Sequence, residues 1–222
     1  MLPFNIVGTG PGSWDLLTLK ACQIITSSQI IIGSPRSIKT IEFLFQDSKT
    51  QPEIYFLQRN HENIPGLIRQ RGQKKLSVLV SGDPGFYSLL GYLAQHFEAR
   101  EIQVCPGISS IQAAAANLTM GWQNSLFFSV HGREIPKDIS AIKTGFAQGK
   151  QIFVLLDSQK NPSCFADMLK QRNFPVKQSH FTLFYNLGYE NQKIIHSTYS
   201  NLKSCIQEES LCLMLLSKGT II

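Results

Sequence analysis

The sequence predicts an α/β protein of two α/β domains, with a mostly parallel sheet in the first and a mixed sheet in the second. Two observations predict this fold class. In the first 120 residues, short apolar runs typical of buried strands alternate with segments whose apolar residues recur at helical spacing. After Met120-Gly121-Trp122, strand candidates follow one another with fewer helices between them. We therefore expect domains at residues 1–120 and 121–222, with a cleft between them as the default place for a ligand.

In the first domain, strands and helices alternate, as a parallel sheet covered by helices requires. The apolar runs predict strands at residues 4–7, 29–33, 54–57, 76–80 and 102–105. Helical spacing of leucine, isoleucine and alanine predicts helices at 14–25, 37–45, 63–71, the stretch that ends at His96, and 109–118. The basic cluster from Arg69 to Lys75 coincides with the end of the third helix, where cations suit the helix dipole.

The second domain contains more strand candidates than helix candidates, which predicts the mixed sheet. Its strands are expected at 126–130, 151–156, 177–185, 193–198 and 211–216. Its helices are expected at 135–147, 162–171 and 201–206. No internal repeat or low-complexity tract is visible in the sequence.

The composition, 43% hydrophobic and 16% charged residues, is typical of a globular protein. The five cysteines are scattered and form no C-x-x-C pair, which argues against a disulfide framework or a zinc site and favours buried, reduced thiols. The chain start lacks the features of a secretory signal, and no apolar run reaches membrane-spanning length, so we expect a soluble cytoplasmic protein without a membrane partner. The net charge of +6 favours acidic partners, but no motif interleaves basic and aromatic residues, so we do not expect nucleic acid.

Three predicted strands of the first domain end in loops rich in glycine and proline. The loops are Gly8-Thr9-Gly10-Pro11-Gly12, Ser81-Gly82-Asp83-Pro84-Gly85 and Cys105-Pro106-Gly107-Ile108-Ser109-Ser110. Glycine lets the backbone come close to a ligand, and proline restricts its shape. Because the carboxyl ends of parallel strands share one edge of a sheet, we expect the three loops together at the edge where ligands bind. Each loop alone could also be a tight turn.

The first loop differs from the dinucleotide-binding fingerprint G-x-G-x-x-G. Its third glycine stands at position 12 where the spacing requires 13, and Pro11 has no amide hydrogen for a pyrophosphate. The second strand ends in Gly33-Ser34, without an acidic residue for a ribose. An NADP enzyme that uses Arg36 for the 2′-phosphate is an alternative interpretation.

Further motifs accompany these loops along nearly the whole chain. They are Leu17-Thr18-Leu19-Lys20-Ala21, Phe86-Tyr87-Ser88, Ser129-Val130-His131-Gly132-Arg133-Glu134 and Asn186-Leu187-Gly188-Tyr189-Glu190. In this order the loops and motifs resemble the tetrapyrrole methylase family. They are most similar to the branch that methylates carbon 5 of a precorrin or cobalt-precorrin in cobalamin biosynthesis.

The resemblance implies the tetrapyrrole methylase fold, a homodimer, S-adenosylmethionine in the cleft between two α/β domains, a corrin precursor as substrate, and no metal required by the protein. The family positions that contact the cofactor correspond to Ser81, Gly82, Asp83, Phe86, Ser109 and Ser110, and less closely to Leu156, Asn186 and Leu187. The loop with Gly10, Pro11 and Gly12 would face the tetrapyrrole. Tyr185 is a departure, since the branch has an acid before Asn-Leu-Gly. Some relatives carry a fused methyltransferase for carbon 15, for which 222 residues leave no room.

Methyl transfer from a sulfonium is an in-line displacement, so the protein mainly has to align the reacting atoms and exclude water. By residue type, Asp83 and His131 are candidates for a base that removes a proton afterwards, and neither is assigned a catalytic role. Carboxylates of the corrin precursor would pair with arginines that follow strand-end loops, namely Arg36, Arg59 and Arg133. The alternatives are a methylase of this fold with another precorrin position or another acceptor, such as RNA ribose, and a noncatalytic nucleic-acid-binding protein.

Overall fold

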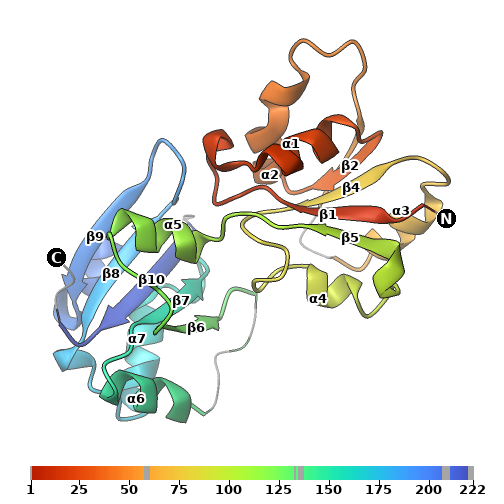
Figure 1. Cartoon of the computed structure of the whole chain (residues 1–222). Coiled ribbons are helices and arrows are strands. Elements are labelled where there is room, and N and C mark those ends of the chain that lie inside the picture. Colours follow the sequence, from red (N-terminus) through yellow and green to blue (C-terminus); the bar gives the residue numbers. More distant parts are fainter. Residues whose placement is uncertain (1, 58–60, 133, 135–137, 207–210, 220–222) are drawn as a thin grey trace. The chain divides into compact units, whose positions relative to one another are not determined.

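The computed structural model describes residues 2–57, 61–132, 134, 138–206 and 211–219. Its contacts divide the chain into two compact units, Met1–Ser110 and Ile111–Ile222, each with its own five-stranded sheet (Figure 1). One sheet is parallel and the other is mixed, so the predicted fold class is confirmed. The units divide at the start of a helix rather than at residue 120, and the boundary at 120 stays a prediction for the functional domains.

The first unit contains a fully parallel sheet with the strand order β3-β2-β4-β1-β5. The strands are β1 (Phe4–Gly8), β2 (Ile30–Gly33), β3 (Glu53–Phe56), β4 (Leu76–Val80) and β5 (Ile102–Cys105). The three inner strands are buried along almost their whole length, which explains why they consist mainly of apolar residues. The edge strands β3 and β5 expose several residues.

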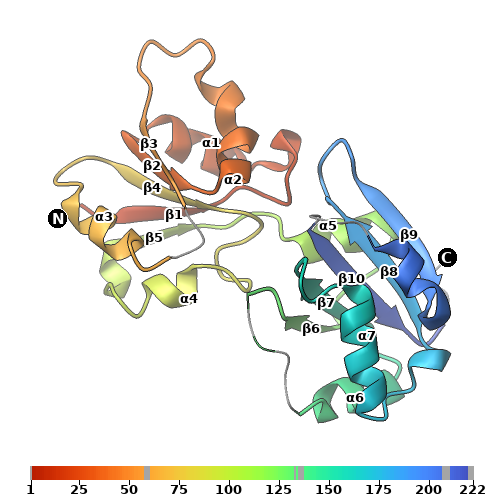
Figure 2. The ribbon, with the colours of Figure 1, turned by 180° about the vertical axis from the view of Figure 1, so that it is seen from behind.

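Helices cover both faces of this sheet, as Figures 1 and 2 show. On one face, α1 (Leu19–Thr26) and α2 (Pro35–Ile41) pack in a core that contains Val7 and Leu79. On the other, α3 (Ile64–Gln70) and α4 (Leu90–Leu93) pack in a core that contains Ile6 and Val78. Successive strand residues point to opposite faces, so neighbouring residues of β1 and β4 belong to different cores.

The second unit contains a mixed sheet with the order β6-β7-β10-β8-β9. The strands are β6 (Leu126–Ser129), β7 (Ile152–Leu156), β8 (His180–Tyr185), β9 (Lys193–Thr198) and β10 (Cys212–Ser217). Only the β6–β7 pair is parallel among these neighbours. In the register, Cys212 lies opposite both Leu156 and Tyr185, so β7 and β8 end at the edge where β10 begins.

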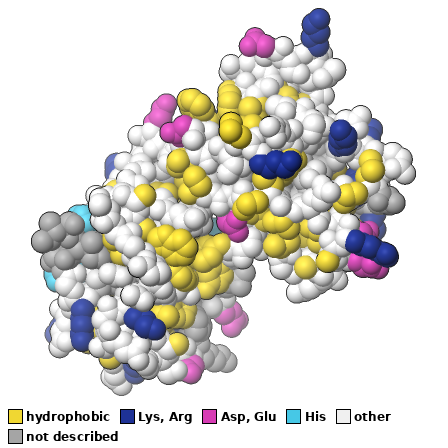
Figure 3. Space-filling view, in the orientation of Figure 1, with side chains coloured by type: hydrophobic (Ala, Val, Ile, Leu, Met, Phe, Trp, Pro, Cys, Tyr) yellow, Lys and Arg dark blue, Asp and Glu magenta, His cyan; other side chains and the backbone are white. Residues whose placement is uncertain are grey.

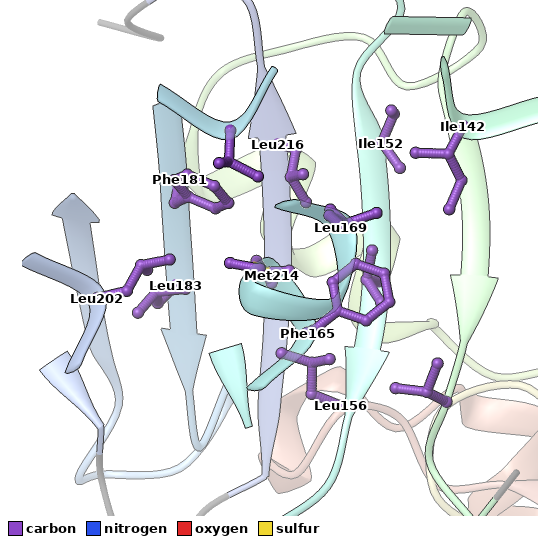
Figure 4. Packing of buried hydrophobic residues seen from close by; sticks show 14 of the residues in the cluster. Ile142, Ile152, Leu156, Phe165, Leu169, Phe181, Leu183, Leu202, Met214 and Leu216 are labelled. Carbon is purple, nitrogen blue, oxygen red and sulfur yellow. The ribbon is translucent and has the colours of Figure 1, made fainter. Parts of the chain in front are cut away.

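Three helices pack on the second sheet: α5 (Ser110–Asn117), α6 (Ser140–Ala147) and α7 (Pro162–Gln171). Phe165 and Leu169 of α7 are fully buried and lie over Met214 of β10 (Figure 4). Figures 1 and 2 show α5 on the opposite face of the sheet from α7. The helix predicted at 162–171 is confirmed with the same bounds, and its buried residues form an apolar stripe.

Some predicted elements are shorter or are interrupted. The predicted helix 14–25 is a 3-10 turn, η1 (Trp14–Leu16), followed by α1, because Leu17 and Thr18 are extended and the Thr18 hydroxyl caps α1 by accepting from the Ala21 amide at 3.0 Å. The predicted helix up to His96 reduces to α4. The predicted helix 37–45 becomes α2 and the 3-10 helix η2 (Glu42–Phe45).

Three corrections concern the second unit. The predicted strand 177–185 starts only at His180, because η4 (Val176–Gln178) forms a 3-10 turn after Pro175. The predicted helix 201–206 belongs to a longer 3-10 segment, η5 (Tyr199–Cys205). The predicted helix 135–147 begins at Ser140, and residues 135–137 lie outside the described part.

All five cysteines are free thiols, as the scattered spacing predicted. Cys105 and Cys212 are buried, Cys22 and Cys205 are half-buried, and Cys164 is exposed, so the expectation of buried thiols is wrong for Cys164. Among the described residues, no helix combines the length and apolar character that a membrane crossing needs.

Candidate functional site

The three loops of the first unit meet at one edge of its sheet, as predicted. β4, β1 and β5 are parallel neighbours, so the loops that follow them leave the sheet side by side. The Thr9 amide donates to the Val80 carbonyl at 2.8 Å, and the Gly82 amide donates to the Gly10 carbonyl at 2.7 Å. These hydrogen bonds continue the β1–β4 pairing and join the first two loops.

Three glycines make this close packing possible. A Cβ atom on Gly107 would lie 2.3 Å from the Gly82 carbonyl oxygen, and one on Gly8 would lie 2.5 Å from the same atom. Gly82 itself has a φ of +68°, which side chains rarely allow. Gly8 and Gly107 are therefore required by the contact of the loops with each other, and Gly82 by its backbone conformation, whether or not a ligand approaches.

The Asp83 carboxylate connects the second loop to the third. Its Oδ1 accepts a hydrogen bond from the Gly85 amide at 2.8 Å, and its Oδ2 accepts one from the Gly107 amide at 3.2 Å. Because both oxygens already accept from backbone amides, the side chain determines the shape of the loops. This geometry supports a positioning role for Asp83 rather than a role as a base.

The second loop presents polar and aromatic groups beside this linkage. Ser81 is exposed, and Phe86 is half-buried with its ring 4.9 Å from the Tyr87 ring. Tyr87 has a φ of +50°, an uncommon conformation for a residue with a side chain, and such backbone is found often at binding sites. The sequence indicated Phe86 but gave no signal for the conformation of Tyr87.

Ser109 and Ser110 of the third loop lie next to the second loop. A Cβ atom on Gly82 would be 3.7 Å from the Ser109 Cα and 3.9 Å from the Ser110 nitrogen. Ser109 is buried, Ser110 is half-buried, and Ser110 is the first residue of α5. The structure thus brings the predicted cofactor residues of the first unit together at one edge of its sheet.

The first loop contacts α2. Gly10 and Pro11 are buried and Gly12 is half-buried. The buried hydroxyl of Thr40 donates to the Gly12 carbonyl at 3.2 Å and to the Arg36 carbonyl at 3.0 Å. Arg36 is exposed one helical turn before Thr40, so it lies on the same face of α2 as the contact with the loop.

The predicted residues of the second unit also meet at one edge of their sheet. Leu156 ends β7, and Asn186 and Leu187 follow β8. Asn186 has a φ of +49°, and its amide donates to the Leu211 carbonyl at 3.1 Å, directly before β10. The side chains of Leu156 and Leu187 are buried, so at these positions a ligand would meet mainly backbone groups.

Tyr185, the departure noted in the sequence, points into the core of the second unit. It is 1% exposed, belongs to the core cluster that α7 covers, and lies opposite Cys212 of the neighbouring strand β10. Burial raises the pKa of the Cys212 thiol to about 12. A hydrogen bond with Tyr185 lowers this pKa, but burial has the larger effect. The tyrosine therefore replaces the expected acid with a residue that suits an apolar interior.

Asp157, which the sequence analysis did not single out, lies next to the candidate residue Leu156 and holds two loops. It follows β7 directly and is 17% exposed. Its Oδ1 accepts from the amides of Gln159 at 3.0 Å and Lys160 at 2.7 Å, and its Oδ2 accepts from the Gly132 amide at 3.1 Å. Partial burial raises the pKa of Asp157, but these amides and the nearby Lys160 and His131 outweigh it and hold the pKa below its ordinary value.

The remaining candidates are placed only in part. His131 is exposed in the loop that Asp157 holds through Gly132. Arg59 and Arg133 lie outside the described residues. Within the described ranges, no group of three or more histidine, cysteine or acidic side chains could bind a metal ion. On the face shown in Figure 3, lysine and arginine side chains are dispersed among other types.

The fold and these edges define a two-unit α/β protein whose parallel sheet presents three glycine-containing loops at its carboxyl edge. Residues 3–203 match the model of the family described as Tetrapyrrole (Corrin/Porphyrin) Methylases. The chain therefore belongs to the tetrapyrrole methylase family, as the motifs indicated.

Two relatives are similar over most of their length. The chain is 30% identical over 216 residues to a Methanocaldococcus jannaschii protein named "Probable cobalt-precorrin-7 C(5)-methyltransferase", which covers 91% of this chain and 96% of the relative. It is 26% identical over 192 residues to the cobalt-precorrin-7 C(5)-methyltransferase of Salmonella typhimurium, which covers 86% of this chain and 88% of the relative.

Solved structures share the fold. The methyltransferase CobJ matches with a TM-score of 0.81 at 17% identity and covers 98% of this chain and 94% of its own. The uroporphyrin-III C-methyltransferase of Thermus thermophilus, solved in complex with S-adenosylhomocysteine, matches with a TM-score of 0.76 at 18% identity and covers 97% of this chain and 92% of its own.

Proposed function

We propose that this chain is an S-adenosylmethionine-dependent C-methyltransferase that methylates carbon 5 of a precorrin or cobalt-precorrin in cobalamin biosynthesis. The observation that carries the proposal is the nearly full-length similarity to proteins named for this reaction. The convergence of the three loops supports it, because these loops contain the motifs that indicated the family.

The cofactor would be held at the loop edge of the first unit. The three loops pack closely at their glycines. The edge that they form presents the exposed Ser81 hydroxyl, the partly exposed Phe86 ring and backbone groups. The cofactor residues that we propose are Ser81, Gly82, Asp83, Phe86, Ser109 and Ser110, with Leu156, Asn186 and Leu187 of the second unit. Asp83 would act mainly by fixing the loops through its two amide contacts.

The corrin precursor would be bound by the first loop and by arginines. Its acetate and propionate carboxylates suit guanidinium groups, which form paired, charge-assisted hydrogen bonds. We propose Gly10, Pro11, Gly12, Arg36 and Arg133 as substrate-side residues. Of the two arginines, Arg36 is exposed beside the first loop.

When bound, S-adenosylmethionine supplies a methyl group on a positively charged sulfur. The residues of this chain have to hold the carbon nucleophile in line with that methyl group and keep water out. By residue type, Asp83 and His131 are the candidates for accepting the proton that leaves carbon 5, and Asp83 also holds the loops through its two amide contacts.

The first test is isothermal titration with S-adenosylhomocysteine. We expect one equivalent per chain with micromolar affinity, and at least tenfold weaker binding in Asp83→Ala, because the loops lose the link between Gly85 and Gly107. Asp47→Ala is the matched control, since Asp47 is exposed and lies outside the loops. Absence of binding by the folded wild-type chain would contradict the proposed cofactor.

The second test identifies the acceptor. Incubation with S-adenosylmethionine and either metal-free or cobalt-loaded precursor should give a product with one added methyl group, located at carbon 5 by NMR. A methyl group at another carbon would assign the chain to another precorrin methylase of this fold. Transfer to RNA or protein, with no transfer to a precorrin, would refute the proposed substrate class.

We also propose that the enzyme acts as a cytoplasmic homodimer, as the family resemblance implies. Light scattering of the purified chain should then give twice the mass of one chain, with and without S-adenosylhomocysteine. A monomer under both conditions would contradict this part of the proposal.

A further inference from the structure

A pair of exposed aromatic side chains lies beside the first loop. Trp14 of η1 is 64% exposed, and Phe43 of η2 is 39% exposed. Their ring centroids are 5.5 Å apart with an interplanar angle of 56°. Single exposed apolar residues are common, but two large aromatic rings in contact at the surface form a patch of the kind found at binding sites.

The backbone connects this pair to the candidate substrate loop. Trp14 stands two residues after Gly12, and Gly12 is held on α2 by the Thr40 hydroxyl at 3.2 Å. Arg36 and Thr40 are four residues apart on one face of α2, and Phe43 follows in η2, two residues after α2 ends. The first loop is thus linked to Arg36 through Thr40 and to the aromatic pair through the chain, and we take Gly12, Arg36, Trp14 and Phe43 as one candidate surface of the first unit.

The chemistry of this surface is specific. It combines two aromatic faces with exposed cations, since Lys39 on α2 is exposed as well as Arg36. Aromatic faces attract flat, polarisable rings by dispersion and offset stacking, and arginine attracts carboxylates. A ligand with a large conjugated ring and carboxylates around its periphery satisfies both requirements.

We propose that Trp14 and Phe43 bind the ring face of the tetrapyrrole substrate while Arg36 pairs with one of its peripheral carboxylates. This inference rests on the proposed function, because it assigns the substrate of that reaction to this surface. Trp14 and Phe43 are then recognition residues, which determine substrate affinity and leave cofactor binding unchanged.

The test compares substitutions at exposed aromatic residues. The probe is cobyrinic acid, a stable cobalt corrin with acetate and propionate side chains, titrated into the full-length chain. Trp14→Ala and Phe43→Ala should weaken its binding about tenfold each, whereas Trp14→Phe should keep most of the affinity because it retains a ring. Trp122→Ala is the matched control, since Trp122 is 42% exposed but lies outside this surface.

The two tryptophans of the chain allow a second readout. In Trp122→Phe, Trp14 is the only tryptophan, and saturating cobyrinic acid should reduce the access of acrylamide to its fluorescence. In Trp14→Phe, the fluorescence of Trp122 should show no such protection. This readout reports contact at the ring itself and does not depend on activity.

The outcomes separate this inference from the proposed function. Unchanged corrin affinity and unchanged KM for the precursor in Trp14→Ala and Phe43→Ala, with a wild-type chain that methylates carbon 5, would overturn the inference alone. Loss of the dimer in these variants would also overturn it, because the pair would then belong to a subunit contact. Unchanged S-adenosylhomocysteine binding together with a raised KM for the precursor would support it.

Discussion

Gly107 is the residue whose replacement should damage the loop edge most directly. In Gly107→Ala the new Cβ would lie 2.3 Å from the Gly82 carbonyl oxygen. The oxygen is a backbone atom and the Cβ is bonded directly to the backbone, so relieving the clash requires one of the two loops to shift. We expect the free energy of unfolding to fall by about 2–4 kcal/mol and S-adenosylhomocysteine binding to weaken at least tenfold. Urea denaturation and calorimetric titration measure the two effects.

Gly66→Ala is the matched control for this substitution. Gly66 lies in α3, and a Cβ atom there would meet nothing within 4 Å. Alanine favours a helix over glycine, so we expect a gain in stability of about 0.5–1 kcal/mol and unchanged binding. Equal stability and equal affinity in the two variants would show that the loops do not pack as described.

Asp157 should give a stability effect that depends on pH. Its pKa is lower in the folded chain than the ordinary value of 3.8, so its contribution is present at neutral pH and is lost as the pH falls through the folded pKa. Asp157→Asn should lower the free energy of unfolding by about 1–3 kcal/mol at neutral pH. The difference from wild type should shrink below about pH 4.

The same denaturation series on Asp47→Asn provides the control, because Asp47 is exposed. A difference between wild type and Asp157→Asn that stays constant from neutral to acidic pH would contradict the role of the charged carboxylate. The sequence did not indicate Asp157, because two of its partners, Gln159 and Lys160, form an ordinary local turn and the third, Gly132, is 25 residues away in the chain.

At the level of elements, α7 illustrates how a helix stabilises its sheet. Phe165 is fully buried in the core of the second unit, over the β10 strand (Figure 4). Phe165→Ala should lower the free energy of unfolding by about 3–5 kcal/mol, because it removes buried apolar surface and leaves a cavity. Gln171→Ala, at an exposed position of the same helix, should change it by less than about 0.5 kcal/mol.

Hydrogen exchange followed by mass spectrometry can assign the Phe165 effect to its element. Exchange should speed up in β7, β8 and β10, which share this core, and remain unchanged in β1 and β4. Equal acceleration in all of these strands would contradict separate cores for the two units.

Hydrophobic pattern predicted most elements, because the inner strands are mainly apolar and α7 has a clear apolar stripe. Pattern failed where local backbone geometry determines the outcome. Thr18 adopts an extended conformation and starts α1 late, and Tyr87 has a positive φ in a stretch expected to lead into a helix. That the three loops meet could be predicted, because they follow parallel strands. The hydrogen bonds that Asp83 accepts from the Gly85 and Gly107 amides depend on distances that a sequence does not contain.

At the scale of the whole molecule, the reactivity of the cysteines reports on the packing of both units, since Cys105 lies in a core of the first unit and Cys212 in the core of the second. Alkylation with iodoacetamide at about pH 8 should label Cys164 in the native chain, since it is exposed. Burial raises the pKa of the Cys105 and Cys212 thiols, to about 12 for Cys212, so both should react only after unfolding. Peptide mass spectrometry with and without urea measures this order, and native labelling of Cys212 ahead of Cys164 would contradict the packing of the second unit.

The glycine packing of the three loops has a consequence for how such an enzyme could change its substrate. Because Gly8 and Gly107 pack directly against the Gly82 carbonyl oxygen, no single loop can be reshaped without a matching change in the others. Variation is easier at exposed positions that border the loops, such as Trp14 and Arg36, where a new side chain meets mainly solvent. Libraries that aim at a new acceptor should therefore keep the loops fixed and diversify their borders.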